Sequence, residues 1–209
     1  MPPHARLSAI DRIRSAGLVW GPAVFIASWA AAGAMTQGYS PIRDHISDLD
    51  AIDAPTRPLM NVAFVAFAVA AGLAAGPLRR VVGTPSATAI GANALISIGI
   101  MLAPLGVSSD GDRLHAVVAG LGYLTLAAAG PSAAPVLARR SRALAVASVA
   151  VGGITLASLA ASLTIEGSKG FWQRAGITTT DAWLITIGLL AVTGILGRDG
   201  GFATEPGER

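Results

Sequence analysis

The sequence contains no cysteine and carries little charge. Without thiols the chain cannot form disulfides, zinc-thiolate sites or iron–sulfur clusters, and it has no thiol nucleophile. Only 13% of its 209 residues are charged and 5% are aromatic, whereas 53% are hydrophobic. The mean hydropathy is +0.61. Because a water-soluble domain cannot bury that much apolar surface, the composition indicates a membrane protein.

Six apolar segments alternate with short polar regions. They cover residues 15–35, 59–78, 87–107, 115–138, 144–165 and 178–197, and none has Lys, Arg or Glu in its interior. A helix of about 20 apolar residues spans the hydrocarbon core of a bilayer. We therefore predict an all-α fold, an integral membrane bundle of six transmembrane helices. Residues 1–209 form a single membrane domain in this prediction, and residues 198–209 form a polar tail.

The charges differ between the two sides of the predicted bundle. The N-terminal segment, the second and fourth loops and the C-terminal tail carry ten arginines and four carboxylates, a net charge of +6. The other three loops, counted with Asp181, carry five basic residues and eight carboxylates, a net charge of −3. Cytoplasmic loops retain the excess of basic residues. We expect a cell-membrane protein with both termini in the cytoplasm and no nucleic-acid partner.

The first outer loop holds the most informative segment, YSPIRDHISDLD at residues 39–50. Ser40 is suited to cap a helix that begins at Pro41, because a proline at the first helical position loses no hydrogen bond. Apolar residues then recur at helical spacing, at Ile42, Ile46, Leu49 and Ile52. The segment predicts a short amphipathic helix that lies on the outer membrane surface or over the mouth of the bundle.

Carboxylates and histidines gather on this outer side. The candidate catalytic residues, suited to act as general acid or base, are Asp44, His45, Asp48, Asp112 and His115. Within the first and third loops a histidine and an aspartate are three residues apart, so their side chains can converge on one side of a helix. The candidate substrate-binding residues are Tyr39, Arg43, Arg113, Trp172, Gln173, Arg174, Asp181 and Trp183.

A simpler interpretation of the same residues remains open. Acidic loops that also contain arginines form solvated ion pairs, and Trp172 and Trp183 then belong to an interfacial aromatic belt. Asp181, Asp112 and His115 lie closest to membrane depth, where an ionisable group needs a partner. The sequence has no HExxH, HxxxH or GxSxG pattern, so we predict no metal, no cofactor and no serine nucleophile.

Two patterns within the spans bear on helix packing. Gly72 and Gly76 form a GxxxG pair, whose spacing allows a neighbouring backbone to approach. Asn93 and Ser97 share one face of the third span, where polar side chains either join helices or line a pore.

The loop segments resemble a family of prokaryotic six-helix membrane proteins catalogued as a domain of unknown function. The resemblance is carried by Tyr-Ser-Pro at 39–41, Ile-Ser-Asp-Leu at 46–49, Pro58 and Asn61, the segment from Asp110 to His115, and Gly170, Phe171, Gln173 and Arg174. It covers essentially the whole chain. It implies a common fold and a shared outer site, and it implies no particular activity.

Three functions are open at this point. The first is acid–base catalysis on a lipid or isoprenoid, for example proton-initiated cyclisation or headgroup hydrolysis, in a pocket shared by His45, Asp48, Asp112 and His115. The second is a non-enzymatic scaffold that binds lipid or a partner, with those side chains fully paired. The third is a small transporter with a polar path, which we disfavour because the sequence places no carboxylate near the middle of a span.

Overall fold

The computed structural model describes residues 7–195, and every regular element in that range is a helix. The elements are α1 (Ala9–Ser15), α2 (Gly17–Met35), the 3-10 helix η1 (Ile46–Asp50), α3 (Arg57–Val82), α4 (Thr84–Leu102), α5 (Ser109–Leu137), α6 (Arg142–Thr164) and α7 (Lys169–Thr193). In this range six helices are long and apolar enough to cross a membrane, with α1 and α2 counted as one. The predicted six-helix membrane bundle is confirmed. The predicted tail at 198–209 lies outside the described residues.

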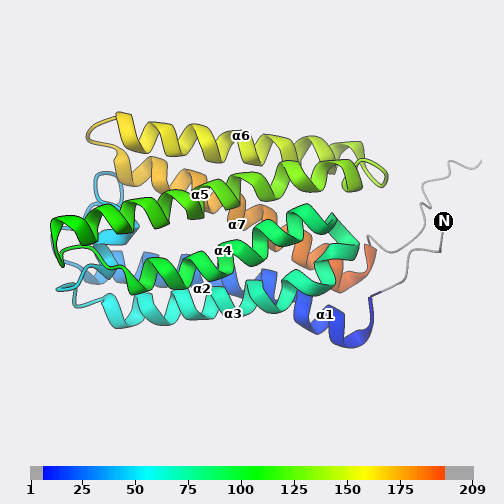
Figure 1. Ribbon diagram of the computed structural model, residues 1–209, viewed down its shortest axis with the longest axis horizontal. Helices are drawn as coiled ribbons and strands as arrows, with labels where there is room; N and C mark the ends of the chain where they lie inside the picture. The colour runs from blue at the N-terminus through cyan, green and yellow to red at the C-terminus, as the bar shows by residue number, and fades with distance from the viewer. Residues whose placement is uncertain (1–6, 196–209) are drawn as a thin grey trace, which may run out of the picture.

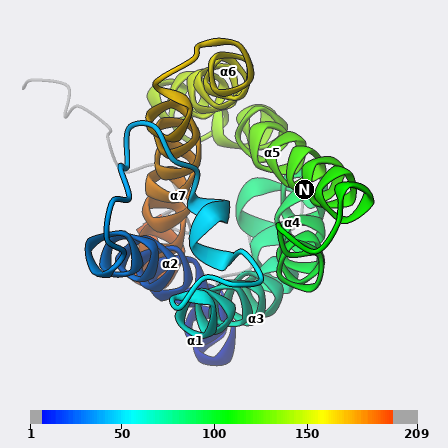
Figure 2. The same ribbon diagram turned by 90° about the vertical axis from the view of Figure 1, so that its left-hand side faces the viewer.

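The long helices are arranged as a ring with one helix outside it (Figures 1 and 2). α2, α3, α4, α5 and α7 surround the centre, and α6 packs outside against α5 and α7. The connections that follow α3, α4, α5 and α6 are short, which makes these successive helices antiparallel neighbours. We call the end that carries residues 36–56, 103–108 and 165–168 the loop end. The opposite end carries α1, Gly83 and residues 138–141, and we call it the arginine end.

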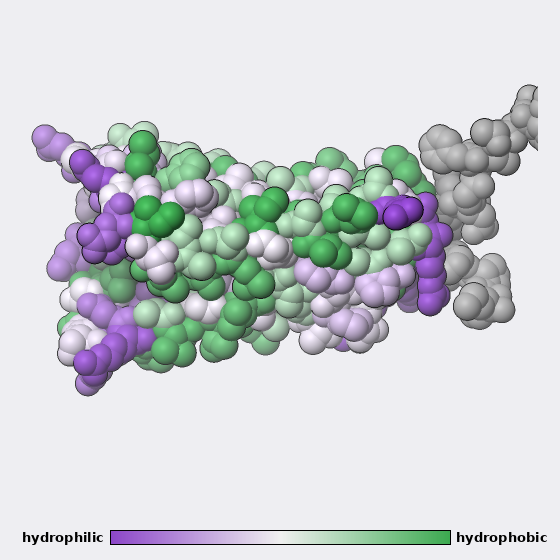
Figure 3. All heavy atoms as spheres, turned by 90° about the horizontal axis from the view of Figure 1, so that it is seen from above, coloured by the Kyte–Doolittle hydropathy of each residue, from purple (hydrophilic) through white to green (hydrophobic). Residues whose placement is uncertain are grey.

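The outer surface matches a protein embedded in lipid. Figure 3 shows apolar residues along the middle of the bundle and hydrophilic residues at its two ends. Large apolar side chains such as Val62, Leu73 and Leu95 are more than half exposed. Lipid tails, unlike water, make no demand that such side chains be buried.

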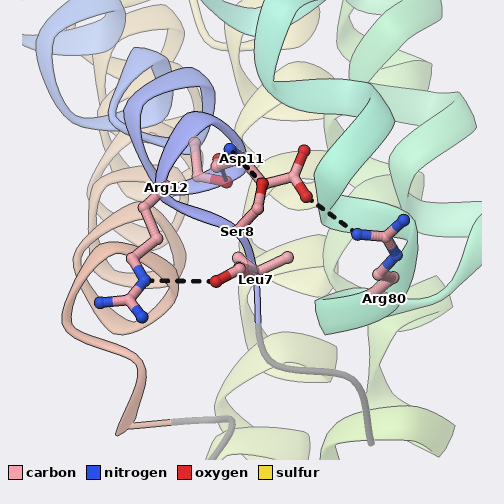
Figure 4. Close-up of polar contacts among 6 residues, drawn as sticks. Leu7, Ser8, Asp11, Arg12 and Arg80 are labelled. Atoms are coloured by element: carbon pink, nitrogen blue, oxygen red, sulfur yellow. Dashed lines mark hydrogen bonds and ion pairs between the residues drawn. The ribbon is translucent and has the colours of Figure 1, made fainter.

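Arginine side chains fasten the segments at the arginine end. Figure 4 shows Ser8 at the start of α1, where its Oγ accepts a hydrogen bond from the Asp11 N–H at 3.1 Å. The Asp11 carboxylate pairs with Arg80, at the end of α3, at 2.9 Å. Arg140 donates to the carbonyls of Arg80 and Val81 at 3.4 Å. The short helix α1 and the α5–α6 connection are thereby tied to the end of α3.

The first outer loop differs from the predicted helix. Instead of one helix from Pro41, the chain forms a turn, in which the Asp44 N–H donates to the Ser40 carbonyl at 2.8 Å, and then η1. His45 between them is extended, with φ −72° and ψ 157°, so the two turns do not join. The expected apolar edge is therefore divided. Its middle members Ile46 and Leu49 are buried, whereas Ile42 and Ile52 at its ends are exposed.

Close helix packing occurs at glycines other than the predicted pair. A Cβ atom on Gly17, Gly130 or Gly152 would lie closer than 3.0 Å to the backbone of a neighbouring helix. A Cβ atom on Gly72 or Gly76 would have no atom of another helix within 4 Å. The predicted close approach of a neighbouring helix of this chain to the Gly72–Gly76 pair is therefore wrong. Which glycines serve packing thus depends on how the helices are rotated.

Candidate functional site

A buried arginine connects the first loop to the last helix. Arg174, 8% exposed, donates from Nη1 to the carbonyls of Pro41 at 2.8 Å and Asp44 at 2.9 Å. Its Nη2 donates to the Tyr39 hydroxyl. The guanidinium also lies over the rings of Trp29, 5.1 Å from the centroid, and Tyr39, at 5.4 Å. Arg174 thus binds the first loop through hydrogen bonds to backbone carbonyls and through cation–π contacts with aromatic rings. It forms no ion pair among the described residues.

The neighbours of Arg174 on α7 complete this connection. The Gln173 Oε1 accepts from the Ile46 N–H at 2.6 Å, and the Phe171 N–H donates to the Ile42 carbonyl at 2.9 Å. A Cβ on Gly170 would overlap the Asp44 carbonyl, which explains a glycine at this position. These contacts occupy the first two turns of α7. They explain why α7 begins at Lys169, well before residue 178, where we predicted it.

Two aspartates of the first loop, Asp44 and Asp48, stabilise its backbone. The Asp44 Oδ2 accepts from the Ser40 N–H, and the Asp48 Oδ2 from the His45 N–H, both at 2.7 Å. The Tyr39 hydroxyl donates to the His45 carbonyl at 2.9 Å. Burial raises the pKa of the Tyr39 phenol, against the opposing effect of Arg174, so the phenol keeps the proton that it donates.

The third-loop residues have similar structural partners. The Asp112 Oδ1 accepts from the Gly106 N–H at 2.8 Å. His115 is 4% exposed, and its Nδ1 lies 2.7 Å from the Ala103 carbonyl, which can only accept. Arg113 is exposed and pairs with Asp110 at 3.3 Å. No described hydrogen bond joins Asp112 or His115 to His45 or Asp48, so the catalytic role of these residues stays a prediction.

The remaining candidate residues divide between the surface and the bundle interior. Arg43 is exposed, and Trp172 is half-buried with its ring 5.1 Å from that of Phe171. Trp183 is 6% exposed, and its Nε1 donates to the Ser148 Oγ on α6 at 2.9 Å. The alternative of an interfacial position for Trp183 is therefore wrong, because α7 begins earlier than expected and carries this side chain deep into the bundle.

A cavity of about 70 Å³ lies inside the helix ring. Ile46 and Ser47 of η1 line it at the loop end, and all five ring helices contribute to its wall. The wall is mainly apolar and includes Phe25, Phe64 and Phe67. The ring of Phe25 lies 5.2 Å from that of Phe64 and 5.9 Å from that of Phe67. Figure 2 shows η1 covering the middle of the ring at this end.

A carboxyl group lies in this apolar wall. Asp181 lines the cavity, is 1% exposed, and its Oδ2 has no hydrogen-bond partner in the described structure. It follows Lys169 by twelve residues in a helix of 25, or about 18 Å along the axis at 1.5 Å per residue. Asp181 therefore lies near the middle of its span. The expectation that no carboxylate lies there, on which we disfavoured a transporter, is wrong.

None of the five candidate catalytic residues lines the cavity. Of the candidate substrate-binding residues, only Gln173 and Asp181 do so. The other polar residues in the wall are Ser47, Asn93, Ser97 and Tyr123. The shared face of Asn93 and Ser97 was visible in the sequence, whereas Tyr123 and the three phenylalanines carry no local signal that separates them from other apolar residues.

A second buried carboxyl lies at the end of η1. Asp50 is 1% exposed, and neither of its carboxyl oxygens has a hydrogen-bond partner within residues 7–195. Arg57 Nε and Asn61 Oδ1, at the start of α3, are also buried without such partners. Burial raises the pKa of Asp50 to about 7, while the positive charge of Arg57 acts in the opposite direction. Asp50 is not among the site residues predicted from the sequence.

The raised pKa of Asp50 makes fold stability depend on pH. An unfolded aspartate titrates near pH 3.9, so between about pH 4 and pH 7 the unfolded chain releases a proton that the folded chain retains. The free energy of unfolding therefore falls as the pH rises through this window and levels off above it. We expect the thermal unfolding midpoint in detergent to fall accordingly, and Asp50→Asn to reduce that slope. Exposed Asp53→Asn is the control, and an equal slope in all three proteins would contradict the assignment.

Comparison with known proteins identifies the family of this membrane bundle. The family described as "Protein of unknown function (DUF998)" matches residues 19–190. This range includes most of each membrane-spanning helix, all the residues that carry the family resemblance, and every residue of the cavity wall. No curated protein and no solved structure matches the chain. The chain belongs to the DUF998 family of multi-pass membrane proteins.

Proposed function

We propose that this protein binds the apolar chain of a lipid, isoprenoid or similar amphiphile in the cavity inside its helix ring. The cavity is the observation that carries the proposal, because apolar ligands are held in concave apolar sites with a few polar groups. A cavity needs roughly 10–15 Å³ to hold one water molecule. The 70 Å³ cavity therefore accommodates several non-hydrogen atoms of a narrow chain.

The position of the cavity supports a ligand that comes from the membrane. Its wall is built by helices whose outer faces meet lipid, and η1 covers it at the loop end. With the termini cytoplasmic, as the charge distribution favours, the loop end faces outward. The ligand then enters from the outer leaflet. The contacts of Arg174 and Gln173 hold η1 over the bound chain.

Binding is the core of this proposal, and catalysis is a distinct extension of it. Acid–base chemistry on a bound lipid or isoprenoid requires a titratable group that touches the ligand. Asp181 meets that requirement by lining the cavity. Asp44, His45, Asp48, Asp112 and His115 do not line it, and most of them bind backbone groups, so the extension assigns the acid role to Asp181.

The test is mass spectrometry of lipids and small molecules that co-purify with matched variants. Ala119 lines the cavity, whereas Ala116, one turn earlier on α5, is exposed. Ala119→Leu places extra atoms in the cavity and Ala116→Leu places them in lipid. We expect the wild type and Ala116→Leu to retain a common ligand in near-stoichiometric amount, and Ala119→Leu to retain much less.

The same samples separate the alternatives. Equal ligand retention by Ala119→Leu and Ala116→Leu would show that the ligand binds outside the cavity. If neither the wild type nor either variant retains a ligand, the scaffold function is favoured. When the identified ligand is added to purified protein, its conversion by the wild type but not by Asp181→Asn would establish catalysis. Binding without conversion would leave a binding protein.

A further inference from the structure

We propose that the ligand of the cavity carries a protonated amine, and that its ammonium group binds Asp181. This inference rests on the proposed function, since it names the polar group of the amphiphile that the cavity holds. It follows from the charge of the cavity, from its unused hydrogen-bonding groups and from its aromatic rings.

The first argument is charge. Asp181 is buried at the middle of its helix, and no described hydrogen bond or ion pair reaches its Oδ2. Within the part of the chain that the structure describes, no lysine, arginine or histidine lines the cavity. Arg174, two turns earlier on α7, is directed to the Pro41 and Asp44 carbonyls. An ionised carboxylate in an apolar region is costly, and an ammonium group on the ligand would offset that cost, because no cation within residues 7–195 pairs with Asp181.

The second argument is hydrogen-bonding capacity. The Asn93 Nδ2 donates to the Gly122 carbonyl and the Thr125 Oγ1, both at 2.9 Å, which leaves the Asn93 Oδ1 as an acceptor. Tyr123 donates its hydroxyl proton to the Gln173 carbonyl at 2.7 Å.

Ser97 likewise donates to the Asn93 carbonyl at 2.9 Å. Asn93, Tyr123 and Ser97 therefore offer hydrogen-bond acceptors to a ligand. The unused donors in the wall are the Gln173 amide and the Ser47 hydroxyl, and both residues lie at the loop end. A primary ammonium has three donors and no acceptor, which complements the deeper part of the cavity.

The third argument is the aromatic cluster. Phe25, Phe64 and Phe67 come from two helices and lie together in the wall. The faces of aromatic rings attract cations and also pack well against alkyl chains. One cavity thus combines an unpaired carboxyl, unused acceptors and aromatic rings, which together fit an aliphatic amine better than a neutral lipid alcohol.

The experiment compares octylamine with 1-octanol, two probes of equal chain length that differ in the head group. At pH 7 the amine is protonated, because aliphatic amines titrate near pH 10. Each probe is titrated into detergent-purified protein, and the dissociation constant is obtained from the rise in unfolding temperature with concentration. The variants are Asp181→Asn and, as a control that removes an exposed carboxylate, Asp110→Asn.

We expect the wild type and Asp110→Asn to bind octylamine about tenfold more tightly than octanol, the scale of one desolvated charge pair. Asp181→Asn should lose this preference and still bind octanol. Equal affinity of the wild type for both probes, or a preference that survives in Asp181→Asn, would overturn the inference and leave chain binding intact. If neither probe binds the wild type, the proposed function fails as well.

Discussion

Replacing Arg174 by methionine should strongly destabilise the loop end of the protein. The side chain makes several charge-assisted hydrogen bonds and stacks on two aromatic rings, and methionine of similar length leaves the Pro41 and Asp44 carbonyls without these donors. Hydrogen bonds from charged groups contribute about 1.5–3 kcal/mol each in soluble proteins, though they count for less in membranes, so we expect a loss on the order of 2–4 kcal/mol. Thermal unfolding in detergent measures it.

Amide hydrogen exchange shows which part of the protein Arg174→Met destabilises. In Arg174→Met the amides of residues 39–50 should exchange faster, while those in the middle of α5 and α6 should not change. Arg43→Met is the matched control, because Arg43 lies in the first loop, which Arg174 contacts, but is itself exposed. Its cost in stability should stay within about 0.5 kcal/mol. Similar losses in the two variants would show that Arg174 does not hold the loop.

Two adjacent glycines of α6 should respond in opposite ways to alanine. A Cβ on Gly152 would overlap the Ala127 carbonyl and the Pro131 ring of α5, whereas one on Gly153 would meet no atom within 4 Å. Overpacking at such a contact costs typically 1–3 kcal/mol. Gly153→Ala should be neutral or slightly stabilising, since alanine favours a helix over glycine by up to about 1 kcal/mol.

Thermal unfolding of the two single variants tests this pair directly. Because α6 lies outside the ring and contributes no residue to the cavity, Gly152→Ala should lower stability more than it lowers ligand retention. Equal stability of Gly152→Ala and Gly153→Ala would mean that α5 and α6 do not pack at the distance described here.

The motif segments that carry the family resemblance have a structural explanation at several positions. Tyr39, Gly170, Gln173 and Arg174 join the first loop to α7 by hydrogen bonds and a close approach. Asp48 caps η1 and Asp112 binds the Gly106 amide. Local pairing of His45 with Asp48 was predictable from their spacing, but the Asp48 carboxylate binds the His45 backbone N–H and not the imidazole. A polar motif in a loop is therefore weak evidence for catalysis until its partners are known.

The membrane class, the number of spans and their approximate positions could be predicted from the sequence alone, because hydropathy and span length are local properties of the chain. The sequence also located the segments that meet at the loop end. Tertiary structure decided what those segments do. The start of α7 moved to Lys169 because its first turns bury Gln173 and Arg174 against the first loop, and this shift placed Asp181 in the middle of its span.

Helix rotation decided the rest. It directed Asn93, Tyr123 and three phenylalanines from separate helices into one cavity, and it left the Gly72–Gly76 pair facing outward while Gly130 and Gly152 met a neighbouring backbone. In a membrane span nearly every side chain is apolar or small, and lipid accepts most of them as readily as a protein interior does. Hydrophobic periodicity is then too weak to show which face of a helix turns inward, and only the packed structure reveals it.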